Sequence, residues 1–109
     1  WRGRTARIFL LSLADALLGL QRADEALDPL ERALAIRGRA AGDPTDLADV
    51  QLSLAHALWD AASGERTRAV AMAQQARVAY TAAGDRERDK LAEAVTWLAK
   101  RGGRGRRRR

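Results

Sequence analysis

Apolar residues recur at three- and four-residue intervals along five stretches of the chain, with polar residues between them. This spacing places the apolar side chains on one face of an α-helix. The predicted helices run roughly over residues 5–20, 24–39, 44–60, 65–82 and 85–100. Glycines that end helices lie near the breaks. Pro44 follows Asp43, and the two suit the first helical position and the cap before it.

These spacings also predict which side chains are buried. Few residues are β-branched or aromatic, so we expect no sheet. Alanine supplies 24 of the 109 residues, and such small side chains suit close packing of helices. The expected core consists of Ile8, Leu11, Leu13, Ala14, Leu17, Leu18, Ala26, Leu27, Leu30, Ala33, Leu34, Ile36, Leu47, Val50, Leu54, Ala55, Leu58, Ala69, Met72, Ala73, Ala76, Tyr80, Leu91, Ala94, Val95 and Leu98.

Pro29 does not fit the second predicted helix, because proline removes a backbone donor from a helix interior. Either a kink at Pro29 or a later helix start would reduce that cost. The sequence leaves both open.

Two parts of the chain repeat one pattern of alanines. Ala14 and Ala55 are 41 residues apart, whereas Ala26 and Ala33 each precede a counterpart, Ala69 and Ala76, by 43 residues. A repeat period of about this size indicates stacked helical repeats. We expect repeat one over about 5–42, repeat two over about 43–84 and a single capping helix over about 85–100. The fold class predicted is therefore all-α, an α-solenoid of two helical hairpins and a C-terminal cap.

These alanines resemble the small-residue positions of the tetratricopeptide repeat family. That family has one small residue in the first helix of each repeat and two in the second. Leu13, Leu17 and Leu30 match its large apolar positions in repeat one, and Leu54 and Leu58 match in repeat two. The family period is about 34 residues, so this chain is more similar to the longer kinesin-light-chain type. HEAT-like repeats, with periods of about 40–47 residues, are the main structural alternative.

The resemblance implies a non-catalytic protein–protein interaction module with a concave peptide-binding groove. Similar alanine- and arginine-rich arrays occur at the C-termini of bacterial serine/threonine kinases and regulators, which implies a scaffold within a larger cytoplasmic regulatory protein. On the family template the groove residues are Leu11, Asp15, Leu18, Asp49, Leu52, His56 and Trp59, bordered by Asp60. The alternative is that Trp59 packs against the fifth helix and His56 is only solvated.

An acidic and apolar groove favours a basic or amphipathic helical segment as its partner. Some family members grip a C-terminal carboxylate with lysine and asparagine. The matching positions here are Ile8, Ser12, Asp49 and Ser53, which do not support that clamp.

The net charge of +6 comes from the C-terminal segment 101–109, which carries six arginines, while the rest of the chain is neutral. We expect this segment to be disordered. Arginine- and glycine-rich segments bind nucleic-acid phosphates, so an alternative function is nucleic-acid association. No aromatic residues are interleaved there, and a solvated terminus is favoured. The arginines concerned are Arg104, Arg106, Arg107, Arg108 and Arg109. A second alternative is self-association through the open ends of the solenoid.

Catalysis and metal binding find little support. Ser53 and His56 are three residues apart, but no third orienting group or oxyanion loop accompanies them. With one histidine and no cysteine, only scattered carboxylates remain as ligands. We therefore expect no enzyme activity, no metal and no cofactor. The apolar runs are too short for a membrane span.

Overall fold

The computed structural model describes residues 2–38, 44–61 and 65–101, and within these ranges every regular element is helical. The elements are α1 (Arg2–Gly19), α2 (Ala23–Gly38), α3 (Pro44–Asp60), α4 (Arg66–Ala83), a short 3₁₀ helix η1 (Gly84–Glu87) and α5 (Arg88–Lys100). The all-α prediction and the five predicted helices are confirmed. The fifth α-helix begins three residues later than predicted, because the chain first makes the 3₁₀ turn.

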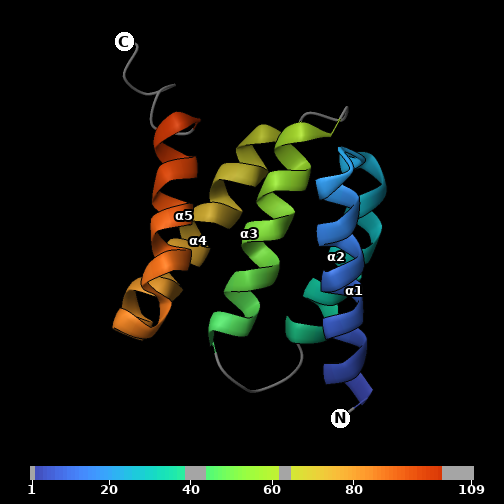
Figure 1. The fold of residues 1–109 in the computed structure, drawn as a ribbon, viewed down its shortest axis with the longest axis horizontal. Coiled ribbons are helices and arrows are strands. Elements are labelled where there is room, and N and C mark those ends of the chain that lie inside the picture. Colours follow the sequence, from blue (N-terminus) through green and yellow to red (C-terminus); the bar gives the residue numbers. More distant parts are fainter. Residues whose placement is uncertain (1, 39–43, 62–64, 102–109) are drawn as a thin grey trace.

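The helices form two layers. Figure 1 shows α1, α3 and α5 side by side in one layer, with α2 and α4 behind them. The chain reverses direction at each connection, so consecutive helices are antiparallel. The first reversal is tight: Gln21 has a positive φ of 61°, and the N–H of Arg22 donates to the carbonyl of Leu17 at 2.8 Å. As the middle helix of its layer, α3 has neighbours on both sides.

Buried alanines line the contacts between the layers. Six alanines at the repeated positions have no exposed surface, as predicted: Ala14, Ala26, Ala33, Ala55, Ala69 and Ala76. Five of them pack with larger side chains that include Leu30, Leu54, Leu58 and Tyr80, whereas Ala33 packs with Leu10 and Val50. A methyl group at these points lets neighbouring helix axes approach closely. The predicted use of alanine in the core is confirmed.

Three residues predicted to be buried are exposed instead. Ile8, Leu13 and Val95 have exposed fractions of 47%, 41% and 46%. They belong to α1 and α5, the two outer helices of the front layer, which are covered on one side only. The apolar spacing of an end helix includes positions that no neighbour within the chain covers. Leu10, which was not predicted, is buried at 8% exposure.

Pro29 lies inside α2, which begins six residues earlier at Ala23, so the late helix start is wrong. The ring is buried, which offsets part of the lost backbone hydrogen bond. Asp24 and Glu25 occupy the first turn of α2, where negative charge suits the helix dipole.

One ion pair joins the two helices of the back layer. The guanidinium of Arg68 on α4 donates to both carboxylate oxygens of Glu31 on α2, at 2.5 and 2.9 Å. These hydrogen bonds lower the pKa of Glu31 below its usual range. Both side chains are more than a third exposed, so water screens the pair and its contribution is small.

The alanine contacts make a direct prediction about side-chain size. Ala69→Leu inserts three carbons where no space is open, and we expect a loss of about 1–3 kcal/mol of folding free energy. Ala71→Leu, the same change at an exposed position of the same helix, should alter stability by less than about 0.5 kcal/mol. Thermal and urea unfolding followed by circular dichroism measure both. Equal effects would show that α4 does not pack through Ala69.

Candidate functional site

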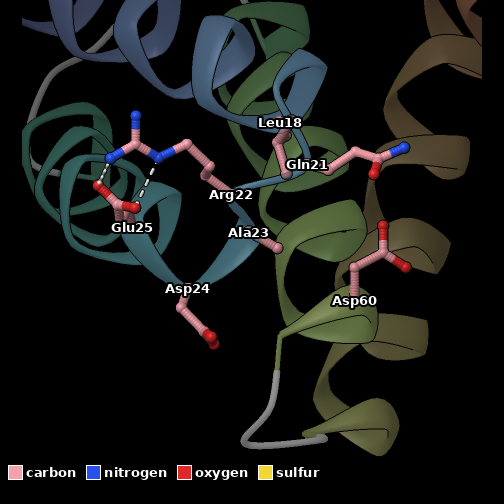
Figure 2. A pocket seen from close by; sticks show the side chains of 7 residues that line it. All are labelled: Leu18, Gln21, Arg22, Ala23, Asp24, Glu25 and Asp60. Atoms are coloured by element: carbon pink, nitrogen blue, oxygen red, sulfur yellow. Dashed lines mark hydrogen bonds and ion pairs between the residues drawn. The ribbon is translucent and has the colours of Figure 1, made fainter.

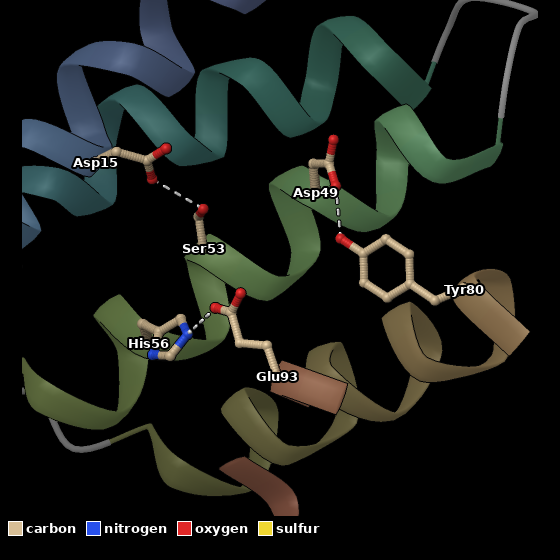
Figure 3. A network of polar contacts seen from close by, with 6 residues as sticks. All are labelled: Asp15, Asp49, Ser53, His56, Tyr80 and Glu93. Atoms are coloured by element: carbon tan, nitrogen blue, oxygen red, sulfur yellow. Dashed lines mark hydrogen bonds and ion pairs between the residues drawn. The ribbon is translucent and has the colours of Figure 1, made fainter. Parts of the chain in front are cut away.

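A row of polar side chains on α3 contacts three other helices (Figure 3). Ser53 donates from its Oγ to Oδ1 of Asp15 on α1, at 3.0 Å. One turn earlier, Asp49 accepts a hydrogen bond from Tyr80 of α4, at 2.6 Å. His56 Nε2 lies 3.3 Å from Oε2 of a carboxylate on α5, that of Glu93. Two of the predicted groove residues of α3, Asp49 and His56, therefore contact side chains of neighbouring helices.

The hydrogen bond between Tyr80 and Asp49 crosses from the core to the surface. Tyr80 has no exposed surface, while Asp49 is half-buried. Burial raises the pKa of the Tyr80 hydroxyl well above its usual range, and the hydrogen bond to Asp49 raises it further. A short hydrogen bond to a carboxylate is among the stronger ones in proteins. Asp49 therefore orients a core residue.

Of the other predicted groove residues of α3, His56 and Trp59 face α5, and Leu52 is buried. Leu52 is only 2% exposed, so its assignment to the groove surface is wrong. Trp59 stacks edge-on against Trp97 of α5, with ring centroids 5.5 Å apart, which confirms the packing alternative for Trp59. His56 also meets the edge of Trp97, at 5.6 Å, so it is not merely solvated. The fifth helix covers the side of α3 that the repeat template leaves open.

The predicted residues on α1 remain partly accessible. Asp15 is exposed, whereas Leu11 and Leu18 are half-buried and pack against the main core cluster. Leu18 also lines a pocket of about 570 Å³ where α1, the turn before α2 and the end of α3 meet (Figure 2). The pocket is lined by Leu18, Gln21, Arg22, Ala23, Asp24, Glu25 and Asp60.

Carboxylates dominate this pocket. Arg22 donates to both oxygens of Glu25, each at 2.7 Å, so the one cation of the lining is held by one carboxylate. Asp60 adds a further negative charge, whereas the charge of Asp24 is offset by the positive end of the α2 helix dipole. Asp60 is the last residue of α3, and the last turn of that helix has no basic residue. The C-terminal end of a helix carries partial negative charge, so the pocket favours a cationic group.

Sequence reasoning placed Asp60 at the border of the groove and missed the rest of the pocket lining except Leu18. The other residues come from the turn between α1 and α2. The break between the predicted helices 5–20 and 24–39 marks that turn, yet its approach to the end of α3 is a tertiary contact that no local spacing encodes.

The remaining predictions concern a catalytic pair, a metal site, a membrane span and the C-terminal arginines. Ser53 and His56 contact different partners, Asp15 and Glu93. Within the described ranges, no group of three or more histidine, cysteine or acidic side chains is arranged to hold a metal ion. None of the helices in the described part is long and apolar enough to cross a membrane. The arginines of the nucleic-acid alternative lie outside the described residues, namely Arg104, Arg106, Arg107, Arg108 and Arg109.

Comparison of the chain with protein-family models, with curated proteins and with solved structures gave no significant match.

The buried hydroxyl of Tyr80, the single tyrosine of the chain, gives a testable pH dependence. An unfolded tyrosine ionises near pH 10. Because the folded pKa is raised, Tyr80 contributes its full stabilisation below pH 10 and loses it as the pH rises further. We expect no tyrosinate absorbance near pH 10 until the chain unfolds. Ionisation at the usual pH in the folded chain would contradict the buried hydrogen bond.

Tyr80→Phe is the matched variant, since it removes only the hydroxyl. It should lower stability at pH 7 by about 1–3 kcal/mol. The difference from the wild type should shrink above pH 10, where the wild type loses this contribution. Unfolding curves at a series of pH values measure both effects.

Proposed function

We propose that this chain is a non-catalytic protein-interaction module of the tetratricopeptide type, an α-solenoid of two hairpins and a capping helix within a larger bacterial regulatory protein. Two observations support the architecture. The alanines that repeat at 41 and 43 residues are all fully buried, and the helices alternate between two layers as stacked hairpins do. Each hairpin leaves one face for the next, which is how such folds bury a continuous core.

The observation that carries the function is the acidic pocket at the end of α3. It lies where the first helical pair meets the second and is bordered by Leu18, a half-buried apolar residue. Its volume of about 570 Å³ is large enough for one long side chain and part of a backbone. The partner that fits is a basic, amphipathic segment. Its cationic side chain enters the pocket, and an apolar residue contacts Leu18.

Asp60 is the strongest indication that the pocket serves binding. An aspartate at the C-terminal end of a helix opposes the helix dipole and costs about 0.3–1 kcal/mol. Residues that serve function often lower stability, because activity and stability trade off at binding and active sites. A cation from a partner would compensate both the carboxylate and the helix end.

The test is selection of binding peptides from a displayed random library on the immobilised full chain. The selected peptides should be enriched in lysine and arginine, and their affinity should fall with salt. Asp60→Asn should weaken the best peptide by about tenfold, the loss expected for a charged hydrogen bond. The same change should leave thermal stability unchanged or slightly raised.

Asp28→Asn is the matched control, because Asp28 is an exposed carboxylate on α2 with a side chain 80% accessible. It should leave peptide binding unchanged. Selected peptides without basic residues, or equal binding by the Asp60→Asn chain, would show that the pocket is not the binding site. A chain ending at Arg101 separates the nucleic-acid alternative, since only nucleic-acid binding should be lost.

A further inference from the structure

The front helix α1 carries an apolar stripe that nothing in the described part of the chain covers. Phe9, Leu13 and Leu20 have exposed fractions of 65%, 41% and 64%, and Ala16 between them is also exposed. Leu20 follows the last residue of α1 and continues the helical turn, since its N–H donates to the carbonyl of Ala16. The four residues are spaced by four, three and four, which is the spacing of a seam between two helices.

The corresponding stripe of α3 shows what such a seam contacts. Forty-one residues after the α1 stripe, at the offset that relates Ala14 to Ala55, four residues are buried. Val50, Leu54 and Ala57 have no exposed surface and Ala61 is 6% exposed. Val50 packs in one cluster with Leu10 of α1 and Ala33 of α2. The α3 stripe is thus the surface by which the second helical pair packs on the first.

α5 also carries an apolar row that packs in the core. Leu91, Ala94 and Leu98 continue the spacing of three and four, and all three pack in the main core cluster. In α3 and α5 an apolar row therefore packs against other helices of the chain. Among the described helices of the front layer, only α1 has such an apolar row with no other helix packed against it.

We infer that the α1 stripe is a self-association surface that pairs with the α1 stripe of a second copy in antiparallel orientation. In that arrangement a twofold axis passes between Leu13 and Ala16. Leu13 of each copy then meets Ala16 of the other, and Phe9 meets Leu20. A large residue opposite a small one fills the middle of the seam, and the two helix dipoles oppose each other.

The composition of the stripe favours a second copy of this surface. All four residues are uncharged, so pairing buries no unmatched charge. By contrast, the exposed face of α2 carries the ion-paired Asp28 and Arg32, which marks a solvated surface. The 18 residues of α1 span only about 27 Å, so we expect a seam along this one helix to bury less area than the roughly 800 Å² per partner of a standard interface. The dimer is therefore of the weak, concentration-dependent class.

Sedimentation equilibrium of the full chain, from the low micromolar to the millimolar range, tests the inference. We expect a reversible monomer–dimer equilibrium with no larger species. Leu13→Glu should raise the dissociation constant by about tenfold or more, because it places a charge in the seam. Val78→Glu is the matched control, since Val78 is 61% exposed on α4, and it should leave dimerisation unchanged. Circular dichroism verifies that both variants fold.

The orientation has its own test, because the chain has no native cysteine. When Leu13→Cys and Ala16→Cys chains are mixed under oxidising conditions, the mixed disulfide should form faster than either symmetrical one. Faster symmetrical disulfides would indicate a parallel pair and overturn the proposed geometry. A strict monomer at millimolar concentration would overturn the inference itself. Growth beyond a dimer would do the same, since it indicates head-to-tail stacking of α1 on another surface.

This surface is separate from the acidic pocket, so the two proposals succeed or fail independently. Asp60→Asn changes the pocket and leaves the stripe intact. Leu13→Glu changes the stripe and leaves the pocket lining intact.

Discussion

The central helix α3 packs against neighbours on both sides, and its alanines make this possible. Ala55 and Ala57 have no exposed surface, and Ala69 and Ala76 of α4 meet them in the same core cluster. Because a methyl group occupies little depth, larger residues such as Leu54 and Leu58 fill the space between the two layers. The polar row then forms at the edge of this contact, since α3 is near enough to α1, α4 and α5 for short side chains to reach. Ser53 and Asp49 would have no partners in a more widely spaced stack.

The local periodicity of the chain was sufficient to predict the helices and most of the core. The repeated alanines were predicted to be buried because their spacing identified helix faces, and all six are. The same reasoning wrongly predicted that Leu13 and Val95 are buried. The reason is tertiary, because a helix at the end of the stack has the apolar pattern of a middle helix but lacks one neighbouring helix. Periodicity within a helix reports which side is apolar and does not report whether another helix is present to cover it.

The candidate site was harder to predict, because its geometry depends on how α5 packs. The repeat template assigns Leu52, His56 and Trp59 to an open groove, whereas Trp97 closes that side of α3. The guanidinium of Arg66 lies 4.6 Å from the Trp59 ring and covers it further. The open surface shifts toward Asp15 and the pocket at Asp60. No spacing within a single helix could have shown this shift of the open surface. It follows from the contact between Trp59 and Trp97, which lie on different helices.

The two ends of the stack differ in chemistry, and this difference argues for a closed pair rather than a polymer. At the C-terminal end, Arg101 lies over the Trp97 ring at 5.0 Å. The exposed face of α5 that carries Val95 also carries the charged Arg88, two turns earlier. At the other end, the α1 stripe is apolar along its whole length. Stacking α1 on the α5 of another copy would place Phe9 or Leu20 beside charged side chains. Those side chains would lose their hydration, which costs free energy. When two α1 stripes pair, each apolar surface is buried against the other in a single contact.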